Sequence, residues 1–387
     1  MLFRFVNNII NTRGTPIPIV MLRPNSEIYN PSDKLYDSVL RSYLNSLNPP
    51  PKYENHPNSK KVAVMIEPRY DDLTIAVLYN FMHFMAPKDD PKPKDDPKPK
   101  DEPKPKDDPE SDVSRGWNFM FISHASHESA VKERFPHMNF VAIDDKYIEM
   151  RNGAPNISIE SYNNIMMSTE FWENTIPSRY DIVCIFQRDC IMYRPFPRVF
   201  ETYSYAGASF GDVLTDDVFM KCTPFYSVGI NGGFSLRNRK HMSFCISTVS
   251  MESVRRFREA QFSILRDIYE AKYKISTKKV VELHWGSTSE DVYFSNACEI
   301  LGLLVPDHYH CARLAVEMKN PSILSGKPAV YHGWNKSYQS FNEAVNYLSQ
   351  TELFAKFVET EKASIPKVVE ESSKSTPVYI LPKDFCD

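Results

Sequence analysis

Four short apolar runs alternate with longer stretches of helical periodicity through the first half of the chain. The runs carry hydrophobic residues in succession, which is typical of strands covered on both faces of a parallel sheet. Strands are predicted in residues 60–69, 116–124, 137–144 and 179–186, and helices in residues 71–85, 126–135 and 158–175. The alternation of strands and helices predicts an α/β fold with a central, mainly parallel sheet and right-handed crossovers.

The pattern changes beyond residue 189 to short strands, loops and two helical runs. Strands are predicted in residues 203–209, 229–238 and 327–334, and helices in residues 255–271 and 289–302. Within the second of these strands, Gly232 and Gly233 suit either a tight turn with positive φ or a close approach of the backbone to a ligand. On the residues alone, a simple turn ahead of the strand FSLR is the preferred interpretation.

The chain divides into one interrupted domain with two flanking segments. Residues 1–55 form an N-terminal extension with a predicted helix in residues 35–47, residues 56–345 form the domain, and residues 346–387 form a C-terminal helix and tail. The interruption, residues 87–110, repeats Pro-Lys-Pro-Lys followed by two acids. Without apolar residues it predicts a solvated, extended tether, either a docking or spacing arm or an insertion tolerated in a surface loop.

Composition and charge narrow the class of protein. The 46 basic and 49 acidic residues nearly balance, which argues against a nucleic-acid-binding protein. The seven cysteines are scattered without a CxxC pair, which favours reduced, buried thiols. The N-terminus lacks the features of a signal peptide, and no segment approaches the roughly 20 apolar residues of a membrane span. We therefore expect a cytoplasmic protein.

Two groups of candidate site residues follow predicted strands that are buried. Asp189 comes directly after the strand at residues 179–186, in the sequence Gln187-Arg188-Asp189, and is either a functional carboxylate or an ordinary loop residue. The carboxyl edge of such a sheet is where ligands bind. Glu67, Pro68 and Arg69 close the first strand, where Arg69 can meet a base or phosphate. A buried structural pair between Glu67 and Arg69 is an equally good interpretation.

Three further candidates lie in the second half of the chain. Glu290 and Asp291 begin a predicted helix, where acids commonly offset the positive helix end but can also serve as a general base. His332 follows a short apolar strand and is either a hydrogen-bonded structural residue or a ligand.

Taken in order, seven stretches resemble a family of GT-A-type glycosyltransferases catalogued largely as a domain of unknown function. The family pattern resembles FQTDS where this chain has FQRDC, and YDYIGAPW where it has YSYAGASF. The stretches, spread over residues 61–335, are VAVMIEPRYDDL, GWNFMFISH, IFQRDCIMYRP, YSYAGASF, NGGFSLRNRKHM, EDVYFS and LAVE. The proline-lysine repeat also resembles tracts in proteins of large viruses of algae. This second resemblance implies a viral protein that works in the host cytoplasm.

The resemblance implies a GT-A-like nucleotide-sugar-binding fold and assigns roles to the candidates. Asp189 resembles the metal-holding residue of a degenerate DXD motif, in which Gln187 replaces the first acid. The resemblance further implies His332 as the second ligand of Mn²⁺ or Mg²⁺. If no metal binds, Gln187 and Arg188 would contact the diphosphate directly.

The same resemblance implies the activity. The residues through Asp189, with Glu67, Pro68 and Arg69, would bind the nucleotide, and residues 205–332, including Gly232 and Gly233, would shape the sugar and acceptor pocket. Asp291 would act as the general base, and Glu290 as a cap or a contact. The expected enzyme is an inverting hexosyl- or pentosyltransferase that moves a sugar from a nucleotide-sugar donor to a hydroxyl of a glycan or glycoprotein.

Two other classes remain open. The missing first acid of the DXD motif favours a carbohydrate-binding protein that kept the fold and lost turnover. A nucleotidyltransferase also needs a sheet edge, a metal and a nucleotide. A Gly-rich, basic loop after the first strand would favour that class, but the sequence EPRYDDL has no glycine.

Deleting residues 87–110 tests the tether interpretation. Because the entropy of loop closure varies slowly with loop length, we expect the melting temperature and donor binding to remain nearly unchanged. A Gly-Ser segment of equal length in the same place should behave identically. A large loss of stability on deletion would show instead that the repeat packs against the domain.

Overall fold

The computed structural model describes residues 53–86, 116–151, 153–192, 194–209, 231–260, 289–317 and 328–333. Four predicted features lie wholly or partly outside these ranges: the helix in residues 35–47, the repeat in residues 87–110, the helical run 255–271 beyond residue 260, and the tail from residue 346.

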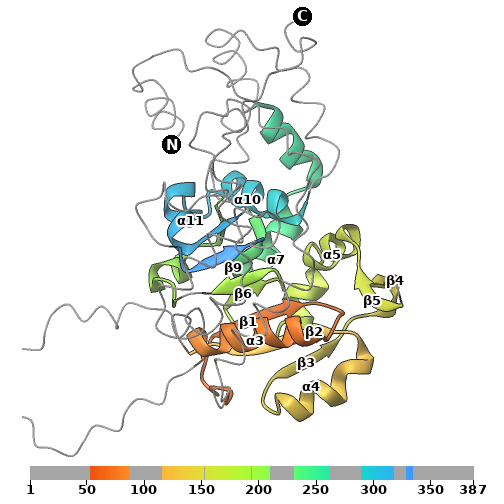
Figure 1. The fold of residues 1–387 in the computed structure, drawn as a ribbon. Helices are drawn as coiled ribbons and strands as arrows, with labels where there is room; N and C mark the ends of the chain where they lie inside the picture. Colours follow the sequence, from red (N-terminus) through yellow and green to blue (C-terminus); the bar gives the residue numbers. More distant parts are fainter. Residues whose placement is uncertain are drawn as a thin grey trace, which may run out of the picture.

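A six-stranded sheet forms the centre of the fold (Figure 1). Its strand order is β3-β2-β1-β6-β9-β8, with parallel pairing from β3 to β6 and antiparallel pairing of β9 with β6 and β8. The strands are β1 (Lys61–Ile66), β2 (Asn118–Ser123), β3 (Asn139–Ala142), β6 (Ile182–Phe186), β8 (Tyr205–Ala208) and β9 (Asn231–Asn238). The predicted α/β fold with a mainly parallel central sheet is confirmed, and the four strands predicted from the first half form its parallel part.

Helices and short helical turns surround this sheet, and Figure 1 shows α3 and α4 at the end of the molecule opposite α10 and α11. The α-helices are α3 (Asp72–Met85), α4 (Glu128–Arg134), α5 (Ile159–Met166), α7 (Arg239–Thr248), α10 (Glu290–Ile300) and α11 (His308–Leu314). The shorter turns are η1 (Ala125–His127), η2 (Asp145–Tyr147), η3 (Phe171–Thr175) and η4 (Arg198–Thr202).

The parallel strands bury both of their faces, as their continuous apolar runs predict. Along β1, Met65 points into one hydrophobic cluster, while Val64 points into a second cluster on the other face. In the first cluster Phe81 of α3 stacks on Phe186 of β6, with ring centroids 4.1 Å apart. Burying each aromatic side chain contributes about 1.5–3 kcal/mol. This packing holds the carboxyl ends of β1 and β6 side by side.

A second, three-stranded sheet lies next to the end of β6. Its order is β10 (Ala315–Glu317), β11 (Val330–His332) and β7 (Cys190–Met192), and His332 of β11 is paired with Cys190 of β7. The buried side chain of Asn80 binds the Met192 backbone, accepting from its N–H at 2.7 Å and donating to its C=O at 2.9 Å. The Asn80 side chain therefore pairs with β7 as a neighbouring strand would, and it fixes the position of β7.

The structure departs from the predicted elements in two places. The helix predicted over residues 158–175 is two elements, α5 and the separate π-helical turn η3. A hairpin of β4 (Ile148–Arg151) and β5 (Ala154–Ile157), turning at Gly153 with φ +77°, was not predicted. The strands of this hairpin, IEMR and APNI, lack the continuous apolar run that marked the predicted strands.

The structure bears on two predictions, about membrane-spanning segments and about the cysteines. Within the described ranges no helix is long and apolar enough to cross a bilayer. The cysteines there, Cys184, Cys190, Cys245, Cys298 and Cys311, are free and buried, as expected. Cys222 and Cys386 lie outside the described residues.

Candidate functional site

A cavity of about 730 Å³ opens at the carboxyl ends of β1 and β6. It is lined by residues from the ends of both strands and from β5, α5, β9, α10 and β11. These are Ile66, Glu67, Arg69, Leu73, Asn156, Ile157, Ser158, Ile159, Tyr162, Asn163, Gln187, Arg188, Asp189, Asn231, Gly232, Gly233, Ser289, Glu290, Asp291 and His332. Every candidate residue from the sequence except Pro68 lies in this lining.

Asp189 and His332 face each other on one side of the cavity. The His332 Nε2 atom is 3.2 Å from Asp189 Oδ1 and 3.2 Å from Gln187 Oε1. The Gly333 N–H donates to the Asp189 carbonyl at 2.9 Å, which fixes β11 against the turn after β6. Two residues more than 140 positions apart in sequence are thus brought together because β11 pairs with β7.

The donor atoms of this corner fit a divalent cation. Asp189, Cys190 and His332 offer ligand atoms that all lie within 4.8 Å of one another. Adjacent ligands ~2.1 Å from an octahedral cation are roughly 3 Å apart, close to the observed separation of His332 Nε2 and Asp189 Oδ1. The Cys190 thiol instead donates to the Gly233 carbonyl at 3.2 Å. With the thiol engaged in this way, the Asp189 carboxylate and the His332 imidazole are the groups that could hold a divalent cation.

Gly232 and Gly233 lie inside β9 and make room for side chains from other elements. A Cβ on Gly233 would lie 2.1 Å from His332 Nε2, and one on Gly232 would lie 2.2 Å from Glu290 Oε1. Neither glycine has the positive φ that a turn would require. The preferred interpretation as a turn was therefore wrong. The space at these two glycines is taken by protein side chains, and the approach of a ligand to their backbone stays a prediction.

The two adjacent acids of α10 have different surroundings. Asp291 is half-buried, and its Oδ2 accepts from the Gly232 N–H at 3.1 Å, while its Oδ1 accepts from the Val292 N–H at 2.7 Å and from the Ser289 hydroxyl. Glu290 is only 3% exposed and makes a bidentate ion pair with Arg237, at 2.5 and 2.9 Å. Burial raises the pKa of the Glu290 carboxyl, and the Arg237 charge opposes that rise.

Two arginines line the cavity near the strand ends. Arg69 pairs with the buried Glu67 through two hydrogen bonds of 2.6 and 2.8 Å, and this pairing raises the pKa of Arg69. The structural pair expected as one alternative therefore exists, although Arg69 also faces the cavity. Arg188 is 2.9 Å from Asp71, the residue that caps α3. Both guanidinium groups are thus oriented by their own carboxylates.

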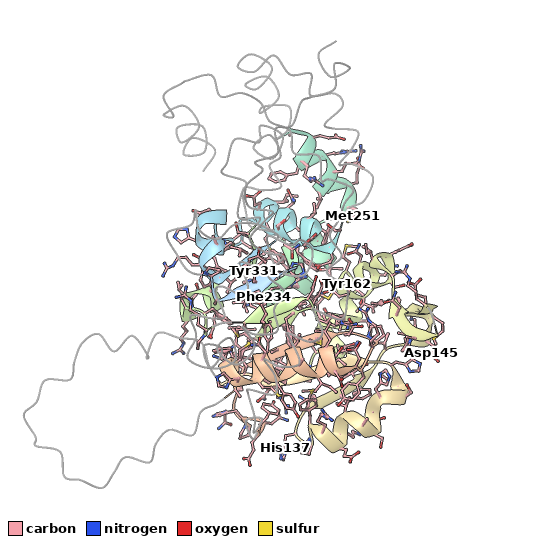
Figure 2. All side chains as sticks on the ribbon, in the orientation of Figure 1. His137, Asp145, Tyr162, Phe234, Met251 and Tyr331 are labelled. Carbon is pink, nitrogen blue, oxygen red and sulfur yellow. The ribbon has the colours of Figure 1, made fainter. Side chains whose placement is uncertain are left out.

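The remaining wall, formed by β5 and α5, was missed by the sequence. Its lining residues carry no charge: Asn156, Ile157, Ser158, Ile159, Tyr162 and Asn163. Tyr162 lies toward the centre of the molecule (Figure 2), and burial raises the pKa of its hydroxyl. Ile159 is 80% exposed. The signal in the sequence was limited to Ser158, the first residue of the predicted helix, which accepts from the Ser161 N–H as its cap.

Comparisons with known proteins give one family and two loosely similar structures. The family described as "Protein of unknown function (DUF5672)" matches residues 139–331, from the first residue of β3 into β11. No curated protein matches the chain. The apo form of mouse xyloside xylosyltransferase 1 is similar at 12% identity and a TM-score of 0.35, over 70% of this chain and 97% of that chain. The glycosyltransferase GlyE of Streptococcus pneumoniae TIGR4 is similar at 11% identity and a TM-score of 0.31, over 80% of this chain and 65% of that chain.

The contact between Gly233 and His332 generates a prediction about metal binding. In Gly233→Ala the new methyl group overlaps the imidazole, so His332 must move away from Asp189. We expect manganese affinity, measured by calorimetry, to fall about 10-fold or more. Gly116→Ala is the matched control, because its methyl group meets nothing within 4 Å and its φ of +78° should cost stability alone. Equal manganese affinity in both variants would contradict a metal site at His332.

Proposed function

We propose that the protein is a nucleotide-sugar-dependent glycosyltransferase with a GT-A-like site. The observation that carries the proposal is the convergence of the Asp189–His332 pair and the Asp291 carboxylate on one cavity at the carboxyl edge of the parallel strands. The resemblance of the sequence motifs to GT-A-type enzymes supports the same activity. Arg69 and Arg188 form a side of the cavity that suits a diphosphate. The neutral wall of β5 and α5 forms another side, which suits a sugar.

The charged side of the cavity is suited to the donor diphosphate. Arg69 and Arg188 present guanidinium groups whose fixed N–H donors match phosphate oxygens. Asp189 and His332 would hold a Mn²⁺ or Mg²⁺ ion. Such an ion would neutralise the charge on the departing diphosphate. The Gln187 carbonyl oxygen lies beside the same corner, 3.2 Å from His332 Nε2.

Asp291 is the proposed general base, because Glu290 is engaged by Arg237. In the reaction the bond between the anomeric carbon and the diphosphate oxygen breaks, and the electron pair leaves with the diphosphate. A hydroxyl oxygen of a glycan or glycoprotein acceptor forms the new bond to the anomeric carbon, and its proton passes to the Asp291 carboxylate. Attack opposite to the leaving group inverts the anomeric configuration.

A panel of nucleotide sugars tests the activity directly. We expect the protein with manganese to hydrolyse or transfer at least one donor in the panel, measured as release of nucleoside diphosphate. Asp189→Ala should abolish this release and weaken donor binding, while the fold survives because this carboxylate lies at the sheet edge. Donor binding without turnover by the native protein would favour the carbohydrate-binding alternative. Release of pyrophosphate from a nucleoside triphosphate would favour the nucleotidyltransferase.

Replacement of the two acids separates their roles. Asp291→Asn should keep donor affinity and lower kcat by a factor on the order of 100 or more, as expected when a general base is lost. Glu290→Gln keeps a hydrogen bond to Arg237 and should lower kcat much less. Steady-state kinetics on the donor from the panel give both values. Exchanged behaviour of the two variants would move the base to Glu290, and normal rates in both would point to a retaining reaction.

A further inference from the structure

Arg237 lies on β9 behind the cavity and outside its lining, and it is 0% exposed. Its Nη1 and Nη2 atoms bind both carboxylate oxygens of Glu290, and its Nε donates to the Ser235 hydroxyl at 2.9 Å. Resting on the function proposed above, we propose that Arg237 is a positioning residue that holds Glu290 and thereby places Asp291 as the acid that faces the acceptor.

The surroundings of Arg237 leave its guanidinium a single orientation. Three aromatic rings surround it, with centroids 5.0 Å away for Tyr205, 5.4 Å for Phe294 and 5.9 Å for Trp172. The ring faces attract the cation and also exclude water from it. A buried guanidinium confined in this way fixes both oxygens of the Glu290 carboxylate, so Glu290 cannot turn toward a substrate without breaking a desolvated ion pair.

The position of Glu290 is transmitted to Asp291 through Gly232. Glu290 Oε1 fills the space where Gly232 would carry a Cβ, and the Gly232 N–H donates to Asp291 Oδ2 at 3.1 Å. The backbone N–H of Glu290 is held as well, because it donates to Asn163 Oδ1 at 3.1 Å. Strand β9 thus contacts both acids at one glycine, and loss of the Glu290 anchor would displace the first turn of α10 that carries Asp291.

A second buried arginine, Arg239, offers a matched comparison. It is 8% exposed and lies two residues after Arg237, but it donates to the backbone carbonyls of Trp172, Tyr180 and Ser178. Both arginines support packing, yet only Arg237 binds a side chain that lines the cavity. Substituting the two residues in the same way therefore separates positioning from stability.

The experiment compares Arg237→Met, Arg237→Lys, Arg239→Met and the double variant Arg237→Met/Glu290→Gln in the full chain. Melting temperature, kcat and KM for the donor found in the panel are measured with manganese present. We expect Arg237→Met to lose stability and about 100-fold in kcat, the loss that a displaced catalytic group causes, with less than 3-fold change in donor KM. Arg237→Lys, which keeps the charge, should retain more kcat. Arg239→Met should lose stability with kcat unchanged.

The double variant decides between the two roles. Removing both members of the ion pair leaves no unpaired buried charge, so its stability should recover, but its kcat should stay low because Glu290 is no longer anchored. Recovery of kcat together with stability would overturn the proposal. Amide hydrogen exchange at Gly232, whose N–H binds Asp291, gives a readout without turnover. Faster exchange in both Arg237→Met variants supports positioning even if no donor reacts, and native protection there overturns it.

Discussion

The site depends on the absence of side chains at two consecutive positions of β9. At Gly232 and Gly233 the strand approaches so closely that Glu290 and His332 occupy the space of the missing Cβ atoms. These two side chains come from α10 and β11, elements that follow β9 by more than 50 residues in the chain. Because a methyl group at either position would overlap a polar atom, the constraint selects glycine for space and not for an unusual backbone conformation.

The buried charges of the site are all held in pairs. Glu290 is matched by Arg237, Glu67 by Arg69, and the partly exposed Asp71 by Arg188. Loss of one partner from a buried pair costs about 3–5 kcal/mol, since the other charge remains desolvated. That cost holds Arg237 and Glu290 in single orientations, whereas Arg69 and Asp71 are partly exposed. Rigid charges of this kind suit a site that must bind a highly charged ligand without rearranging.

The sequence predicted the parallel part of the sheet because long apolar runs and helical periodicity are local patterns. It also predicted most of the charged cavity residues, since Asp189 and Glu67 follow such runs directly. Arg237 was missed because a charge inside the strand FSLRN looks like an ordinary outward-facing residue, and only the burial of β9 makes it internal. The wall from Asn156 to Asn163 carries amides, hydroxyls and isoleucines, which form no motif. Its place in the site depends on tertiary packing that no local pattern encodes.

The replacement of an acid by Gln187 fits the charges around it. A second carboxylate at this position would lie next to Asp189 and beside His332, whose Nε2 is 3.2 Å from the Gln187 oxygen. The amide places a neutral oxygen at this position and adds no negative charge. The neighbouring Arg69 and Arg188 are paired with Glu67 and Asp71. Since Glu67 takes two of the five N–H donors of Arg69, that guanidinium keeps donors for a phosphate. With only one acid at the proposed metal site, the proposed diphosphate would meet less repulsion than it would from a pair of acids.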